Sequence, residues 1–186
     1  MDAIVEFIRD FISAENAALY AQYAERSQTA FLKKLDHLRT FYAEGVAPDV
    51  NDPGKRDAAF FKECAESLDE VKPRLLFQVK HYEHPKLGDL YRAYVSNNTR
   101  SGKRSLYFAN IYVAGKGKER RIIANYVLCR DCAGLGKVDG KKCPECKGAG
   151  WLKAGGAQIP KLDKPVEVRK FLAPDKPEHL IEYEAE

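Results

Sequence analysis

Four of the five cysteines fall in one short stretch, and their spacing constrains this chain more than any other feature. The stretch "CRDCAGLGKVDGKKCPECKGAGW" runs from Cys129 to Trp151 and holds two C-x-x-C pairs separated by ten residues. Two such turns, brought together by a hairpin, offer the four tetrahedral thiolates that structural zinc takes. We therefore predict one structural zinc ion per chain, bound by Cys129, Cys132, Cys143 and Cys146.

Glycines follow both pairs in the same order, so that "CRDCAGLG" and "CPECKGAG" are both C-x-x-C-x-G-x-G. Glycine tolerates the positive φ that a backbone curling around a metal needs. Asp139-Gly140 is a natural turn between the two halves. Two alternatives remain beside the zinc site. A redox pair would open a helix after a strand in a βαβ unit, which neither pair does, and structural disulfides are rare in reducing compartments.

The C-x-x-C-x-G-x-G repeat resembles that of the cysteine-rich zinc domain of DnaJ-type co-chaperones. That domain carries four copies and two zinc ions, so two copies imply one zinc ion here. The resemblance covers the 23 residues from Cys129 to Trp151. The sequence has no His-Pro-Asp tripeptide, so the resemblance does not extend to a J domain.

Before the cysteines, the apolar pattern changes from a helical period to a strand period. Apolar stripes predict helices over residues 4–12 and 31–42, and a third helix from Lys55 to Asp69 with Cys64 on its apolar face. From Arg74 the period is two, which predicts antiparallel strands in "RLLFQVKHY", "LYRAYVS", "SLYFANIYVAG" and "RIIANYVLC". The predicted fold class is α+β: N-terminal helices packed on a curved antiparallel sheet of about four or more strands, with a zinc-knuckle hairpin inserted near the C-terminus.

We expect three segments. Residues 1–128 form the helix-plus-sheet body, and residues 129–151 form the zinc module. Residues 152–186 form a C-terminal extension, in which "VEVRKFL" and "HLIEYE" are candidate edge strands.

The strand pattern of "LYRAYVSNNTRSGKRSLYFANIYVAGKGKERRIIANYVL" resembles the nuclear-transport-factor-two-like fold. That resemblance implies a cone with a pocket, where the enzymes of the family place an Asp, His or Tyr. Other members are non-catalytic binding modules, including immunity proteins that neutralise bacterial toxins. The candidates for the pocket show no spacing typical of a catalytic pair: Tyr20, Tyr23, Asp36, His37, Tyr42, Tyr91 and Tyr94.

The net charge of +4 conceals an asymmetry, because residues 1–71 carry −6 and residues 100–153 carry +9. A basic region of this kind fits an acidic partner, either a protein or a nucleic acid. The basic residues on and near the hairpin are Arg120, Arg121, Arg130, Lys137, Lys141, Lys142 and Lys147. The hairpin offers only Trp151 for stacking on bases, which argues against binding of a single strand there.

We weigh three functions. The favoured one is a non-catalytic protein-binding module with structural zinc, such as a toxin-neutralising immunity protein or a chaperone-like binder. The alternatives are a nucleic-acid-binding protein that uses the basic hairpin, and a small-molecule enzyme with a pocket in the cone. We expect a cytoplasmic protein, because there is no apolar run of about 18 residues and no signal-peptide pattern.

Overall fold

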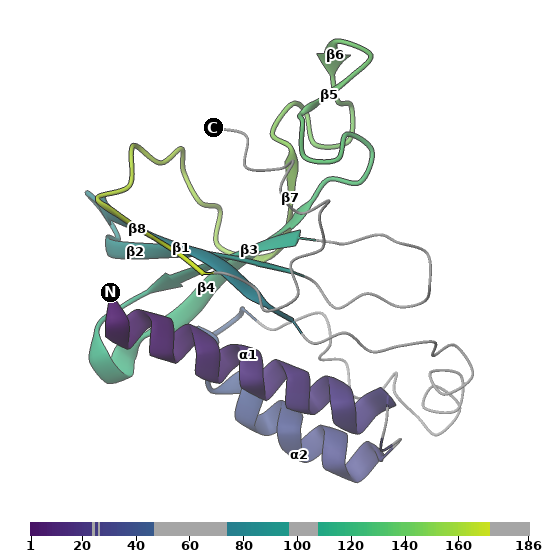
Figure 1. Cartoon of the computed structure of the whole chain (residues 1–186), viewed down its shortest axis with the longest axis vertical. Helices are drawn as coiled ribbons and strands as arrows, with labels where there is room; N and C mark the ends of the chain where they lie inside the picture. Colours follow the sequence, from purple (N-terminus) through teal and green to yellow (C-terminus); the bar gives the residue numbers. More distant parts are fainter. Residues whose placement is uncertain (24, 26, 47–73, 97–107, 172–186) are drawn as a thin grey trace.

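Within residues 1–23, 25, 27–46, 74–96 and 108–171, which the computed structural model describes, the chain forms two α-helices and eight strands (Figure 1). The elements are α1 (Asp2–Tyr23), α2 (Gln28–Arg39), β1 (Leu76–His84), β2 (Gly88–Ser96), β3 (Phe108–Ala114), β4 (Arg121–Leu128), β5 (Lys137–Val138), β6 (Lys141–Lys142), β7 (Trp151–Gly156) and β8 (Glu167–Lys170). The third helix predicted from the sequence, with Cys64, lies outside the described residues.

Both described helices bury the apolar stripes that predicted them. In α1, Ile4, Ile8 and Phe11 are almost fully buried. The second helix, α2, begins after Ser27, whose hydroxyl accepts a hydrogen bond from the Ala30 N–H at 3.2 Å, and it buries Phe31, Leu35 and Leu38. No helix in the described part of the chain has the length and apolar content needed to cross a membrane.

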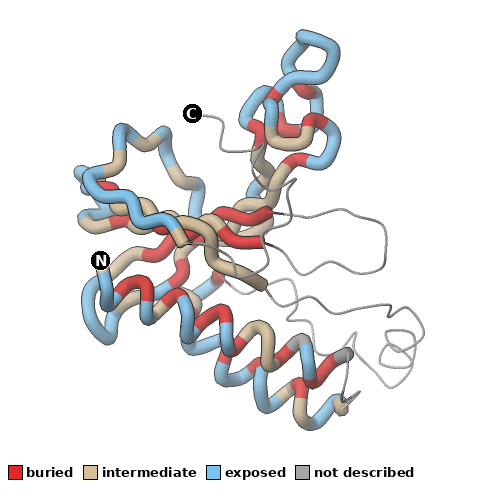
Figure 2. Tube along the Cα trace, in the orientation of Figure 1, coloured by how far each residue is buried: buried red, intermediate tan, exposed pale blue. Residues whose placement is uncertain are grey.

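The main sheet has six strands in the order β7-β4-β3-β2-β1-β8, and all its neighbours are antiparallel. The α+β class is confirmed, and so is the meander of β1 to β4. Both helices lie on one face of this sheet (Figure 1). The main core fills the space between the helices and the sheet, and it includes Val79, Ala93, Ile111 and Val113 from the central strands (Figure 2).

Two further strands extend the sheet beyond the four predicted ones. One edge is β8, which pairs with β1 and lies within the candidate strand "VEVRKFL". The other edge is β7, which pairs with β4 and begins at Trp151, the last residue assigned to the zinc module. Because β4 ends at Leu128, the cysteine segment is inserted between two neighbouring strands of the sheet.

The chain between β7 and β8, residues 157–166, passes across the sheet face that is turned away from the helices (Figure 1). It builds a second, smaller core there, because Ile159 and Leu162 pack against a cluster that contains Tyr82, Leu90 and Tyr112. The Tyr126 hydroxyl accepts a hydrogen bond from the Ile159 N–H at 3.0 Å. This crossover therefore covers one end of the sheet face turned away from the helices. It does not cover the other end of that face, beside the cysteines.

Candidate metal centre

The four clustered cysteines place their sulfurs at the spacing of a metal site. All four Sγ atoms lie within 4.8 Å of one another, with 3.8 Å between Cys129 and Cys143 and 3.6 Å between Cys132 and Cys146. A tetrahedron with metal–sulfur bonds of about 2.3 Å has sulfurs about 3.8 Å apart. All four side chains are buried (Figure 2). The set can hold one metal ion with a sulfur at each tetrahedral position.

Backbone N–H groups point at two of these sulfurs, as the glycine pattern predicts. The Gly136 N–H donates to Cys132 Sγ at 3.3 Å, and the Gly150 N–H donates to Cys146 Sγ at 3.2 Å. In each case the donor lies four residues after the acceptor and is the last glycine of its motif. The two motifs therefore wrap their second cysteines in the same way.

Each motif also holds the other through the backbone. The Cys129 N–H donates to the Gly150 carbonyl, and the Cys143 N–H donates to the Gly136 carbonyl, both at 2.9 Å. Corresponding residues of the two motifs stand 14 positions apart, so this exchange relates two equivalent halves. The first cysteine of each motif is therefore positioned by the last glycine of the other.

The glycines at the end of each motif are required by backbone contact as well as by φ. Gly136 has φ +69° and Gly150 has φ +77°. A Cβ on Gly150 would lie 2.3 Å from the Gly134 carbonyl oxygen, and one on Gly136 would lie 2.4 Å from that of Gly148. Backbone atoms cannot yield to such a contact without opening the module.

Gly150→Ala should therefore lower metal affinity at least about 100-fold, because backbone strain and the steric clash exceed about 2.7 kcal/mol together. Gly148→Ala is the matched control, since its φ is +88° but its Cβ would meet nothing nearer than Lys142 Cγ, at an ordinary 3.5 Å. We expect about tenfold loss for the control, from the left-handed backbone alone. Competition with a chromogenic chelator measures both affinities. Equal losses would show that the close approach is unimportant.

The surroundings of the thiols act on their protonation in different directions. Burial raises the pKa of the Cys129 thiol. At Cys146 burial also acts to raise the pKa. Hydrogen bonds from the Gly150 N–H and from the thiols of Cys132 and Cys143 together outweigh burial, so the pKa of Cys146 falls below its usual range. Every thiol that is still protonated must lose its proton when a metal binds, so the affinity for the metal should rise with pH.

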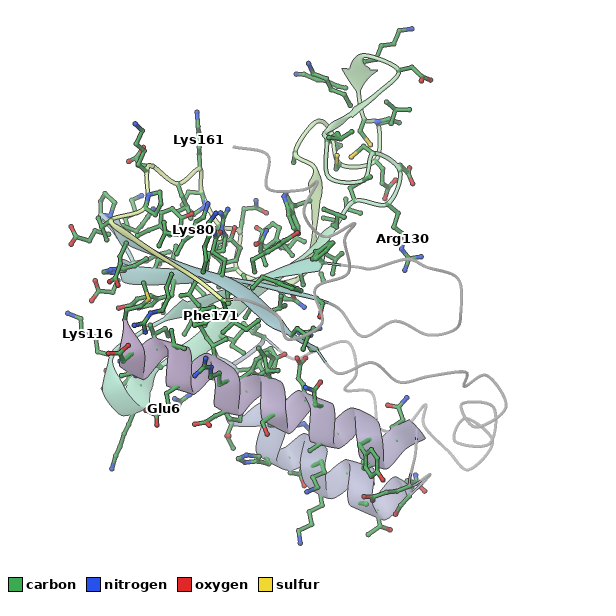
Figure 3. The ribbon with its side chains drawn as sticks, viewed as in Figure 1. Glu6, Lys80, Lys116, Arg130, Lys161 and Phe171 are labelled. Carbon is green, nitrogen blue, oxygen red and sulfur yellow. The ribbon has the colours of Figure 1, made fainter. Side chains whose placement is uncertain are left out.

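The predicted basic residues do not form one surface. Arg120 and Arg121 stand at the start of β4, whereas the cysteine module follows the other end of that strand. The eight residues of β4, at about 3.3 Å each, place these arginines more than about 20 Å from the module. The guanidinium of Arg120 donates to the Ala3 carbonyl at 2.9 Å, and that of Arg121 donates to the Lys118 carbonyl at 2.8 Å. Arg130, by contrast, lies at the base of the module (Figure 3).

The charge of the module itself is balanced when a metal is bound. Four thiolates and a divalent ion carry two negative charges between them. The side chains of residues 129–151 supply five basic and three acidic groups: Arg130, Lys137, Lys141, Lys142 and Lys147 against Asp131, Asp139 and Glu145. The loaded module is therefore close to neutral, which weakens the case for it as a polyanion-binding hairpin.

The candidates for a catalytic pocket are not brought together. They lie on different surfaces: Tyr20, Asp36 and His37 are exposed on the helices, Tyr42 and Tyr91 lie between the helices and the sheet, and Tyr94 lies on the opposite sheet face. Asp36 pairs with Arg39 at 2.8 Å, and the Tyr91 ring stacks on His81 at 4.6 Å. The side chain of Tyr23 lies outside the described residues.

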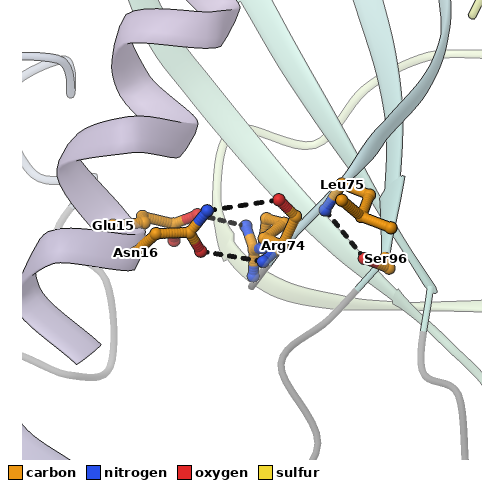
Figure 4. A network of polar contacts seen from close by, with 5 residues as sticks. All are labelled: Glu15, Asn16, Arg74, Leu75 and Ser96. Atoms are coloured by element: carbon orange, nitrogen blue, oxygen red, sulfur yellow. Dashed lines mark hydrogen bonds and ion pairs between the residues drawn. The ribbon is translucent and has the colours of Figure 1, made fainter. Parts of the chain in front are cut away.

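A buried carboxylate that the sequence analysis missed lies between α1 and β1 (Figure 4). Glu15 Oε2 is 2.7 Å from an Arg74 guanidinium nitrogen, and the two side chains are only 12% and 10% exposed. Burial raises the pKa of Glu15, and the Arg74 charge opposes that shift. The signal was in the sequence: Glu15 stands four residues after Phe11 and seven after Ile8, on the apolar stripe.

The neighbours of this pair give it a structural role. Asn16 and Arg74 exchange two hydrogen bonds, from the Arg74 N–H to Asn16 Oδ1 at 2.8 Å and from Asn16 Nδ2 to the Arg74 carbonyl at 3.2 Å (Figure 4). Next along the chain, the Leu75 N–H donates to Ser96 Oγ at 2.9 Å. These contacts fix the middle of α1 to the backbone that leads into β1.

Comparison of this chain with protein-family models, curated proteins and solved structures returned no match. The resemblances to the DnaJ-type zinc domain and to the nuclear-transport-factor-two-like fold thus stay predictions from the sequence.

Proposed function

We propose that the cysteine cluster binds one zinc ion as a structural metal, and that the chain is a non-catalytic binding protein. The observation that carries this is the set of four buried sulfurs within 4.8 Å of one another. Sulfur occupies every tetrahedral position of such a site, so water and substrate have no place on the metal. The metal therefore shapes the protein and takes no part in a reaction.

Zinc fits these ligands better than other common metals. Four thiolates in a tetrahedron suit Zn²⁺ or iron–sulfur chemistry, whereas Mg²⁺ and Ca²⁺ take oxygen ligands. The C-x-x-C-x-G-x-G resemblance to the DnaJ-type zinc domain also supports zinc. The proposed ligands are Cys129, Cys132, Cys143 and Cys146.

A structural metal also accounts for how this segment folds. Apart from the cysteines, the only buried residues among 130–150 are Gly136 and Gly150, and Leu152 is the one apolar side chain that packs against the cluster from β7. Zinc binding in small modules contributes about 10–16 kcal/mol, which is enough to order such a segment. Trp151 follows directly and meets Tyr94 edge-on at 6.2 Å, so a folded module is fixed against the sheet.

The protein partner favoured by the sequence analysis stays a prediction, in its toxin-neutralising and chaperone-like forms alike. The same holds for a nuclear-transport-factor-two-like body. A catalytic role has weaker support, because the buried carboxylate of Glu15 is held by Arg74 and the predicted pocket residues lie apart.

Elemental analysis of protein purified without added metal tests this proposal. We expect about one zinc ion per wild-type chain, as four thiolates predict, and none in the Cys143→Ser/Cys146→Ser variant, with helical circular dichroism retained. Lys141→Ser/Lys142→Ser, in the same hairpin, is the matched control and should keep its zinc. A wild-type chain without zinc, whose thiols cycle between reduced and oxidised forms, would favour the redox alternative instead.

A further inference from the structure

The sheet face that is turned away from the helices carries two rows of polar and aromatic side chains. Strand pairing aligns Lys80 with Arg92 and Arg92 with Tyr112 in one row. It aligns Tyr94, Asn110, Tyr126 and Lys153 in the next row, from β2 to β7. We call this set of seven residues the polar sheet face. Its Tyr112 and Tyr126 pack against the crossover of residues 157–166, and the row from Tyr94 to Lys153 ends at β7, the strand that follows the cysteine module (Figure 1).

The strands place no carboxylate on the polar sheet face. Glu83, Asp89 and Glu167 are the acidic residues of the six main strands. Side chains alternate along a strand, so Glu83 shares the opposite face with Val79 and His81. Register pairs Asp89 with Glu83 and Glu167 with His81, which puts all three on the helix side.

Two of the three cations of this face, Lys80 and Arg92, lie directly across from each other on neighbouring strands. Burial lowers the pKa of Lys80, and the charges of Arg92 and Lys170 lower it further. The Arg92 guanidinium lies over the Tyr82 ring, 5.8 Å from its centroid. Among the described residues, no carboxylate forms an ion pair with Lys80 or Arg92. Clustered cations of this kind leave a positive potential that an anion would neutralise.

Aromatic rings lie next to these cations. Tyr94 stacks on Phe108 with centroids 5.0 Å apart and planes 11° apart. Trp151 and Phe77 meet Tyr94 at 6.2 and 6.0 Å. Tyr94 and Trp151 are each partly exposed. Partly exposed rings that are held in place by their neighbours offer rigid surfaces for stacking.

An amide lies between two of the rings in the same row. Asn110 is only 4% exposed, and it is the one member of the central strand β3 that is buried and polar. Its neighbours across the strands are Tyr94 and Tyr126.

We propose that the polar sheet face binds a single-stranded nucleic acid, with phosphates on Lys80, Arg92 and Lys153 and bases stacked on Tyr94 and Trp151. The inference rests on the binding function proposed above and moves the partner from the neutral module to the sheet. Cationic side chains that contact phosphates, placed beside partly exposed rings, suit a flexible strand, whose bases are free to stack. An acidic peptide would use the cations but not the rings.

The test uses the zinc-loaded full chain and fluorescein-labelled 12-nucleotide RNA and DNA strands, with binding followed by fluorescence anisotropy at about 50 and 200 mM salt. Lys80→Gln/Arg92→Gln should weaken binding at least about tenfold and reduce the salt slope by about 1.4, or about 0.7 per phosphate contact. Tyr94→Leu should weaken binding about tenfold with the slope unchanged. Lys153→Gln changes an exposed residue, so it tests the same face with little risk to folding, and about threefold weakening is expected.

Lys33→Gln is the matched control, because it removes one exposed charge from α2 on the other side of the molecule and should change nothing. Absence of binding at about 50 mM salt, or equal effects of Lys33→Gln and Lys153→Gln, would overturn the inference. So would a polyglutamate peptide that competes as well as the unlabelled oligonucleotide. Zinc is measured in the same samples. A zinc-loaded chain that binds no strand overturns this inference alone, whereas a chain without zinc overturns the metal assignment.

Discussion

Removing the metal should unfold residues 129–150 and leave the six-stranded sheet in place. The four cysteines form a separate buried cluster that only Leu152 joins, whereas the main core lies between the helices and the central strands. Loss of a metal that contributes about 10–16 kcal/mol leaves the segment without a comparable source of order. After chelation, hydrogen exchange should become fast across residues 129–150 and stay slow in β2 and β3.

Trp151 gives a second measurement of the same event. It is the only tryptophan, and it lies between the module and Tyr94, so its fluorescence should change on chelation. The Cys143→Ser/Cys146→Ser variant should already show the changed fluorescence and should not respond to chelator. Acidification should have the same effect as chelation, because protons compete with the metal for the thiolates. If chelation accelerated hydrogen exchange equally in the sheet and in the module, the module would not be an independent folding unit.

Glu15→Ala should destabilise the protein by about 3–5 kcal/mol, because it leaves the buried Arg74 guanidinium without its counter-charge. The pair is nearly closed off from water at both ends, and the Asn16–Arg74 hydrogen bonds hold the arginine in place. The arginine therefore cannot reach solvent without breaking the contact between α1 and the start of β1. Urea denaturation followed by circular dichroism measures the loss.

Two variants give this measurement its reference points. Glu6→Ala removes an exposed carboxylate from the same helix (Figure 3) and should stay within about 0.5 kcal/mol of wild type. Glu15→Leu/Arg74→Leu removes both buried charges and should recover most of the stability, since apolar replacements of buried pairs are often neutral. A double variant as unstable as Glu15→Ala would show that the charges themselves are required.

The elements that the sequence predicts well are those with a local cause. The helical stripe through Ile4, Ile8 and Phe11 predicts α1, and the alternating runs predict β1 to β4, because each pattern repeats within one element. The cysteines also carry local information, since both C-x-x-C-x-G-x-G motifs contain the turn and the N–H donors that their sulfurs need.

The elements that the sequence does not predict depend on distant partners. The strand β7 has the sequence "WLKAGG", which lacks a strand pattern and pairs because β4 offers it an edge. Register has the same non-local origin, so the alignment of Lys80 with Arg92 could not be read from sequence. Glu15 stood on the apolar stripe, but Arg74, the partner that keeps it buried, is 59 positions away.

The 14-residue equivalence of the two cysteine motifs has a consequence for how this module can evolve. Cysteine and glycine recur at the same four positions in each motif, and the metal and the backbone account for all of them. The other four positions differ between the copies: Arg130 and Pro144, Asp131 and Glu145, Ala133 and Lys147, Leu135 and Ala149. The side chains at these positions can thus vary without altering the frame, although Ala133 and Lys147 both hold a left-handed backbone, with φ +49° and +54°, which disfavours β-branched residues there. A repeated unit of this kind can acquire a new surface by point mutation while its architecture stays unchanged.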